Sequence, residues 1–320
     1  MRPIRDKWLI QIEVTNACPN RCANCSRLVA HQRQPYFMSL EEIEAALDSL
    51  DGFPGGIGIM GGEPLLHPHF RDICTLLRRK VPPEKRWLWT TGHNWDKYKT
   101  VIRKTFCGTF FNDHRDRTQK HHPMLLGVAD VTEDSSLVEA LIEDCWVDRR
   151  WSASINPKGC FFCEVAAAFD LLFDGPGGLP VEPGWWRQDP AAFTEQRNRA
   201  CYRCGAPVPF PPLRIAQGHD LASATNYQAL KTLQTPCFSA GAVRLFSGKL
   251  SQEALAEAAR DWQPWSHWGD AGPAKDHNEL SNPDRGPLGR IKHRLEQRYP
   301  WLGPAGNTCR RWLWSLHFDT

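Results

Sequence analysis

Short apolar runs alternate with amphipathic segments along the first 143 residues, and this alternation constrains the fold more than any other feature of the chain. Capping boxes at Ser39/Glu42 and Ser136/Glu139 predict the starts of two helices, over residues 40–50 and up to about residue 143, and a further helix is expected over residues 70–79. Strands separated by helices favour a parallel sheet. The predicted strands are residues 8–14, 57–60, 86–91, 105–112 and 124–128. We therefore expect an α/β fold built as a partial (β/α) TIM-like barrel of five or six parallel strands.

Three cysteines directly follow the first predicted strand. Cys18, Cys22 and Cys25 are spaced C-x3-C-x2-C. Three thiolates so close in sequence can hold three irons of a cubane cluster and leave the fourth iron open to bind a small molecule and pass it an electron. Zinc binding and disulfide formation are the alternatives, and His31 could be a fourth zinc ligand on distance alone. The triplet favours an iron–sulfur cluster without excluding zinc.

A second motif directly follows the second predicted strand. Gly61 and Gly62 allow close backbone approach and positive φ, Glu63 is a natural partner for a ligand ammonium group, and Pro64 stiffens the exit of the turn. Catalytic groups of a (β/α) barrel lie at the carboxyl ends of its strands. We therefore expect this motif and the three cysteines to form one site.

The sequence resembles the radical S-adenosylmethionine (SAM) enzymes over roughly residues 8–130. The cysteine triplet matches their cluster motif, and residues 61–64 match their segment that binds the methionine amine of SAM. The resemblance implies a [4Fe-4S] cluster on the three cysteines that cleaves SAM to methionine and a 5′-deoxyadenosyl radical. In this family an aromatic residue usually precedes the third cysteine, whereas this chain has Asn24. We therefore expect an amide or a backbone group to contact the adenine.

Polar residues at the ends of the third and fourth predicted strands are further candidates for SAM contacts. The family often carries a ribose-side or methionine-side contact where Thr91 and Gly92 lie, and a ribose or carboxylate contact where Asn112, Asp113 and His114 lie. Polar residues are common in surface loops, so caps that face water are the alternative.

A second cysteine group begins where the predicted barrel ends. Residues 151–155 and 160–165 read as a hairpin around a turn at residues 156–159, and a helix is expected over residues 166–173. The pattern resembles the auxiliary-cluster extension, the SPASM or twitch domain, of many radical SAM enzymes. It implies a second [4Fe-4S] cluster on Cys145, Cys201, Cys204 and either Cys163, which we favour, or Cys160. The alternative is a structural zinc site in which Cys160 replaces Cys145, because two C-x2-C pairs are the usual zinc signature.

These patterns divide the chain into a radical SAM partial barrel (residues 1–144), an auxiliary-cluster domain (145–212) and a C-terminal helical and loop extension (213–320). The extension contains predicted helices at residues 250–262 and 288–299, and the second has a basic face that is most often solvated surface. Cys237 and Cys309 are either structural residues or spare auxiliary ligands.

Composition bounds the partners and the compartment. The 320 residues carry a net charge of +3, too balanced to imply a polyanionic partner. No signal-peptide core and no stretch approaching 18 apolar residues is visible, so no membrane contact is expected. We expect the twelve cysteines to be reduced, mostly as metal ligands of a cytoplasmic enzyme.

The most concrete functional expectation is hydrogen abstraction from a small polar or nucleotide-like substrate, leading to dehydrogenation, isomerisation or bond formation. A flavodoxin or ferredoxin would donate the electron, and the auxiliary cluster would assist. Three alternatives remain open: a peptide- or protein-modifying enzyme, an enzyme acting on a hypermodified nucleobase in nucleic acid, and a non-catalytic iron–sulfur or zinc protein.

Overall fold

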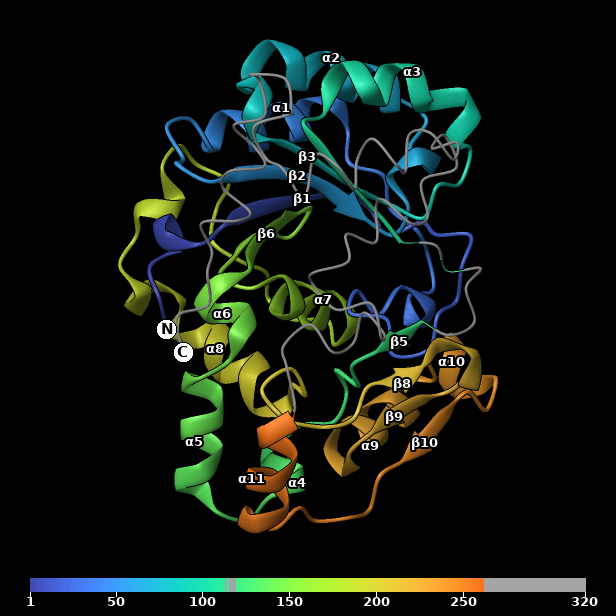
Figure 1. Ribbon diagram of the computed structural model, residues 1–320, viewed down its shortest axis with the longest axis vertical. Helices are drawn as coiled ribbons and strands as arrows, with labels where there is room; N and C mark the ends of the chain where they lie inside the picture. The colour runs from blue at the N-terminus through green and yellow to red at the C-terminus, as the bar shows by residue number, and fades with distance from the viewer. Residues whose placement is uncertain (113, 115–118, 262–320) are drawn as a thin grey trace, which may run out of the picture.

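The centre of the computed structural model, which describes residues 1–112, 114 and 119–261, is a six-stranded sheet (Figure 1). The strand order is β4-β3-β2-β1-β6-β7. The strands are β1 (Leu9–Thr15), β2 (Gly56–Gly61), β3 (Arg86–Thr90), β4 (Gly108–Phe111), β6 (Ser152–Asn156) and β7 (Gly159–Phe161). All pairings are parallel except that of β6 with β7. The predicted α/β fold with a mostly parallel sheet is therefore confirmed.

One predicted strand is wrong. Residues 124–128 form a turn that leads into the short helix α4 (Val128–Val131). Their backbone groups bond to distant segments, since Met124 O accepts from Gly205 N and Leu125 O accepts from Ser223 N. The fifth parallel strand is instead β6, which the sequence suggested only as a hairpin arm, and it pairs with β1.

Three helices cover one face of the sheet: α1 (Leu40–Ser49), α2 (Phe70–Lys80) and α3 (Trp95–Thr105) (Figure 1). The capping box at the start of α1 is confirmed, because Glu42 N donates to Ser39 Oγ and Ser39 N donates to the Glu42 carboxylate. Alternate residues of β1, among them Ile10 and Ile12, join these helices in the main core.

The second predicted capping box does not form. Helix α5 (Ser135–Glu143) is capped by Asp134, whose carboxylate accepts from the backbone N–H groups of Ser136 and Leu137. Glu139 instead accepts from Arg197 and Tyr202. A carboxylate acceptor two residues upstream and two distant donors to Glu139 thus replace the local box.

Aromatic side chains pack together on the other face of the sheet. They are Trp8, Trp87, Trp89, Phe110 and Trp151, and the rings of Trp89 and Phe110 are stacked at 4.5 Å. Trp8 and Trp151 directly precede β1 and β6, whereas Trp89 lies near the carboxyl end of β3.

The remaining elements lie beyond this face (Figure 1). They comprise α6 (Trp146–Arg150), α7 (Glu164–Leu172), α8 (Thr194–Ala200), β5 (Lys120–His121), β8 (Leu213–Arg214), β9 (Asp220–Ala222), α9 (Ala224–Leu233), α10 (Pro236–Ser239), β10 (Val243–Leu245) and α11 (Gln252–Asp261). The predicted hairpin around residues 156–159 corresponds to β6 and β7, and the predicted helix at 250–262 corresponds to α11. The second predicted C-terminal helix, Cys309 and Asp113 lie outside the described residues. None of the described helices is long and apolar enough to cross a membrane.

Candidate active site

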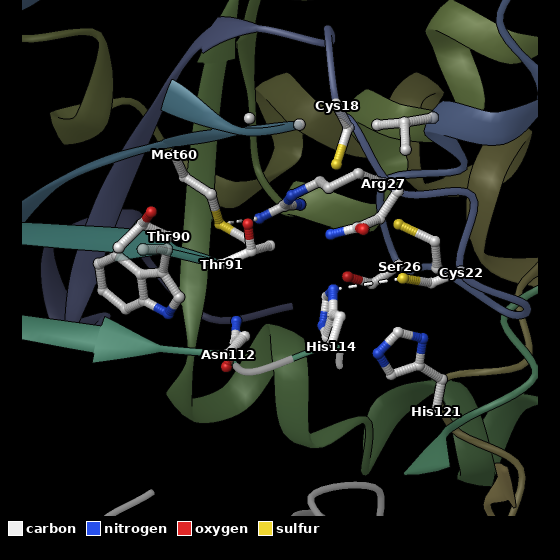
Figure 2. Close-up of a pocket in the computed structure, with 16 residues that line it drawn as sticks. Cys18, Cys22, Ser26, Arg27, Met60, Thr90, Thr91, Asn112, His114 and His121 are labelled. Carbon is white, nitrogen blue, oxygen red and sulfur yellow. Dashed lines mark hydrogen bonds between the residues drawn. The ribbon is translucent and has the colours of Figure 1, made fainter. Parts of the chain in front are cut away.

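A cavity of about 90 Å³ lies at the carboxyl ends of the strands (Figure 2). The loop after β1 brings Cys18, Cys22 and Cys25 to it, and β2 ends on it with Gly61. Thr91 reaches it from the end of β3, and Asn112 and His114 reach it from the end of β4. Residues predicted from separate motifs therefore share one cavity.

The three thiols fit an iron–sulfur cluster as a donor set. Burial, and to a smaller extent the neighbouring thiolates of the triplet, raise the pKa of Cys18 and of Cys22 to about 12. Burial also raises the pKa of Cys25. Three thiolates cannot coexist here without a cation that offsets their charge, and iron in a cubane supplies that charge.

Gly61 and Gly62 join the end of β2 to the cysteine loop. Gly61 has φ +145°, and a Cβ atom there would lie 1.9 Å from Thr15 O. A Cβ atom on Gly62 would lie 2.3 Å from Ala17 O. The backbones bond directly, with Gly62 N donating to Thr15 O and Glu63 N donating to Ala17 O, both at 2.7 Å. The glycine pair is thus required by the approach of the cysteine loop.

The Glu63 carboxylate departs from our expectation of a contact with a ligand ammonium group. It is fully buried and accepts four hydrogen bonds, from the Thr90 hydroxyl, the Thr91 hydroxyl and N–H, and Leu65 N. A carboxylate has about four lone-pair positions, so none remains for a ligand in this arrangement. Glu63 instead holds Thr91 at the cavity, and the following Pro64 opens a 3-10 helix, Pro64–Leu66.

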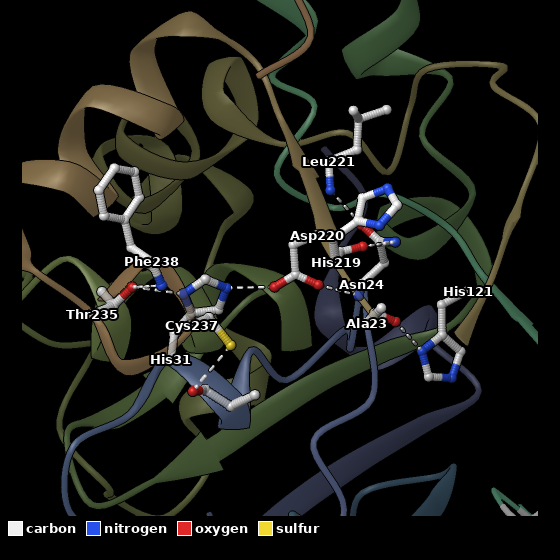
Figure 3. Close-up of polar contacts among 11 residues, drawn as sticks. Ala23, Asn24, His31, His121, His219, Asp220, Leu221, Thr235, Cys237 and Phe238 are labelled. Atoms are coloured by element: carbon white, nitrogen blue, oxygen red, sulfur yellow. Dashed lines mark hydrogen bonds and ion pairs between the residues drawn. The ribbon is translucent and has the colours of Figure 1, made fainter. Parts of the chain in front are cut away.

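Asn24 is also engaged differently from our expectation. Its backbone N–H donates to the Asp220 carboxylate, its side-chain amide donates to His219 O, and its side-chain oxygen accepts from Leu221 N (Figure 3). Asn24 is buried, with φ +54°. The amide that we expected to meet adenine therefore attaches the cysteine loop to β9.

Sequence reasoning missed Arg27, which lines the cavity although its side chain is only 3% exposed (Figure 2). It donates to Glu164 at 2.9 Å and to Gln11, and it lies 3.6 Å from Glu13. Burial raises the pKa of Glu13, and Arg27 opposes that rise. A charged residue two positions after Cys25 was the available signal, but Arg21 in the same loop offers a similar one.

His114, which the sequence suggested as a candidate SAM contact, lies beside Cys22. His114 Nδ1 lies 3.2 Å from Cys22 Sγ (Figure 2). The cavity is also lined by three residues that the sequence analysis did not predict: His121, Met60 and Trp89. The apolar walls come from β2 and β3, so they exclude water from that side of the thiols.

A second cavity, of about 30 Å³, brings together the four other predicted cysteine ligands. It is lined by Cys145 before α6, Cys163 before α7, and Cys201 and Cys204 after α8. Burial raises the pKa of all four thiols, that of Cys163 to about 12. Four converging thiols in an apolar cavity are a donor set for an iron–sulfur cluster or for zinc.

Cys160 does not line this cavity. Its side chain is fully buried within the main core, and only burial raises its pKa. Cys160 lies in β7, whereas Cys163 directly precedes α7 and lines the cavity with the other three thiols. The alternative zinc site, on Cys160, Cys163, Cys201 and Cys204, therefore has only three of its four cysteines at this cavity.

The two cavities are joined by one buried ion pair. Arg27 follows Cys25 by two residues, and Glu164 directly follows Cys163. Their side chains meet at 2.9 Å, and both are less than a tenth exposed. The loop that carries the first three cysteines is thus tied to the start of α7, which carries one of the other four.

The match to a family model agrees with the position of these motifs. A family model described as the radical SAM superfamily matches residues 12–104, which contain both the cysteine triplet and residues 61–64. A crystal structure of BtrN in complex with AdoMet and 2-DOIA is 18% identical, with a TM-score of 0.44, over 62% of this chain and 92% of that one. A crystal structure of selenomethionine BtrN in an open conformation is 15% identical, with a TM-score of 0.39, over 62% of this chain and 86% of that one. No curated protein matches the chain.

Proposed function

We propose that this chain, whose residues 12–104 match the family model of the radical SAM superfamily, is a radical SAM enzyme that removes a hydrogen atom from a small polar or nucleotide-like substrate. One observation carries the proposal. Cys18, Cys22 and Cys25 line the same cavity as the glycine turn after β2 and the polar residues at the ends of β3 and β4.

The residues of this cavity have separable tasks. When bound, a reduced [4Fe-4S] cluster and SAM supply a 5′-deoxyadenosyl radical that takes hydrogen from an unactivated C–H bond. Cys18, Cys22 and Cys25 would hold three corners of that cluster. Gly61 and Gly62 let the cysteine loop pack against the end of β2, and Thr91, fixed by Glu63, offers a hydroxyl at the cavity.

The charge around Arg27 supports a small polar substrate. One guanidinium lies between two carboxylates, those of Glu13 and Glu164, and all three side chains are buried. A polar substrate group can exchange hydrogen bonds with such a network, whereas a large apolar one would leave it unsatisfied. Asn112 adds an amide at the same cavity.

The second cysteine group supports an auxiliary [4Fe-4S] cluster that accepts an electron. Four thiols face one cavity, which is enough to ligate all four irons and to leave no open position for substrate. Lys7 and Arg197 lie beside the thiols and favour their ionised forms. We propose that this cluster receives the electron of the substrate radical, while a flavodoxin or ferredoxin reduces the first cluster.

The test is an anaerobic reconstitution of the chain with iron and sulfide, followed by addition of SAM and dithionite. We expect 5′-deoxyadenosine and methionine in equal amounts, detected by liquid chromatography. A reconstituted, iron-loaded protein that forms no 5′-deoxyadenosine would instead be a non-catalytic iron–sulfur protein.

The same assay tests the substrate class. Candidate small polyols, amino sugars and nucleotides are added in one series, and short peptides and oligonucleotides in another. We expect only the first series to raise the rate of 5′-deoxyadenosine formation. Stimulation by peptides or oligonucleotides alone would overturn the small-substrate proposal and leave the SAM chemistry intact.

A further inference from the structure

Three potential metal ligands meet outside both cysteine cavities (Figure 3). His31 ends the 3-10 helix Val29–His31, Asp220 begins β9, and Cys237 lies in α10. One donor atom of each residue lies within 4.8 Å of the other two. The residues are 2%, 4% and 7% exposed. A nitrogen, an oxygen and a sulfur donor from three separate segments thus converge at a buried point.

Additional contacts hold each donor in place. His31 Nδ1 lies 3.0 Å from Thr235 Oγ1, which fixes the ring, and His31 Nε2 is hydrogen-bonded to Asp220 Oδ2 at 2.5 Å, a bond that a bound cation would replace. Asp220 Oδ1 accepts from the backbone N–H of Asn24. Cys237 Sγ lies 3.3 Å from Ala30 O. Metal-binding histidines commonly have their second ring nitrogen held by such an outer partner.

We propose that His31, Asp220 and Cys237 bind one zinc ion. Imidazole, carboxylate and thiolate are the three ligand types of zinc sites, whereas calcium and magnesium require oxygen ligands. One carboxylate and one thiolate balance the charge of Zn²⁺, so the loaded site is neutral in its buried position. A water molecule completes the tetrahedron. This site is separate from the seven cysteines assigned to clusters and does not depend on the proposed function.

The position of the site gives zinc a structural task. His31 lies on the same loop as Cys25, six residues further along, and Asn24 of that loop is bonded to residues 219–221. A cation shared by His31, Asp220 and Cys237 would cross-link this loop to β9 and α10. Zinc binding energy contributes directly to the stability of such a cross-link.

Zinc X-ray absorption and metal analysis on the purified, cluster-loaded protein test the proposal. We expect about one zinc per chain, with about one sulfur ligand near 2.3 Å and nitrogen or oxygen ligands near 2.0 Å. His31→Gln and Cys237→Ser should each lower the zinc content at least about tenfold without lowering the iron content. The matched control is Cys74→Ser, a buried cysteine of α2 outside the site.

The spectrum of the unaltered protein keeps the test independent of whether the variants fold. Three or four sulfur ligands around zinc would place it in a cysteine cavity and overturn the proposal. Zinc well below one per chain, or zinc that persists in both folded variants, would overturn it as well.

Discussion

Cys22→Ala is expected to abolish the reductive cleavage of SAM. Cys22 is one of three thiols on the cavity, and its removal leaves the cluster with two of the three thiolates assigned to it. Even outer-shell changes at metal sites cost about 10–100-fold in affinity or activity. We therefore expect 5′-deoxyadenosine formation to fall by more than about a hundredfold, measured after anaerobic reconstitution.

Cys107→Ala is the matched control for this loss. Cys107 is exposed and lies outside both cavities. Its rate of 5′-deoxyadenosine formation should equal that of the unaltered chain. Circular dichroism of Cys22→Ala should retain the helical signal, because the loop is not part of the sheet or its covering helices. A folded Cys22→Ala protein with near-normal SAM cleavage would contradict the assignment of this cysteine.

Cys204→Ala should separate SAM cleavage from turnover of the substrate. Removal of this thiol opens the second cavity while the first cavity stays complete. We expect about four fewer irons per chain, retained formation of 5′-deoxyadenosine, and loss of the final product. Iron analysis and product detection on the same sample measure both effects.

Cys160→Ala is the control for this second variant, since Cys160 is a buried cysteine close in sequence that does not line the cavity. It should lose some stability through a small cavity in the core but keep its iron and its product. If Cys160→Ala lost four irons and Cys204→Ala lost none, the ligand set of the second site would be wrong.

The sequence predicted the parallel sheet well because its strands and helices are locally encoded. The alternation of β1 and the capping box of α1 depend on neighbours only a few residues away. The apolar run at residues 124–128 misled the strand prediction because its backbone partners lie near residues 205 and 223. No local pattern distinguishes an apolar run paired in a sheet from one buried under a distant segment.

In the candidate site, too, features that depend on nearby residues were predicted and contacts between distant residues were not. The cysteines and glycines were predicted from spacing, since their chemistry depends on short separations. The hydrogen bonds that occupy the Glu63 carboxylate were not predicted, because two of their donors are the hydroxyls of Thr90 and Thr91, which lie 27 and 28 residues away. The ion pair of Arg27 with Glu164 joins residues 137 positions apart. Such contacts become visible only when the chain is folded.

Electron paramagnetic resonance of the dithionite-reduced protein, recorded before and after addition of SAM, tests the central assignment most directly. The account predicts a reduced [4Fe-4S] signal that SAM perturbs in the unaltered chain and in Cys204→Ala, and that is missing in Cys22→Ala. A signal that SAM leaves unchanged, or zinc in place of iron on Cys18, Cys22 and Cys25, would contradict it.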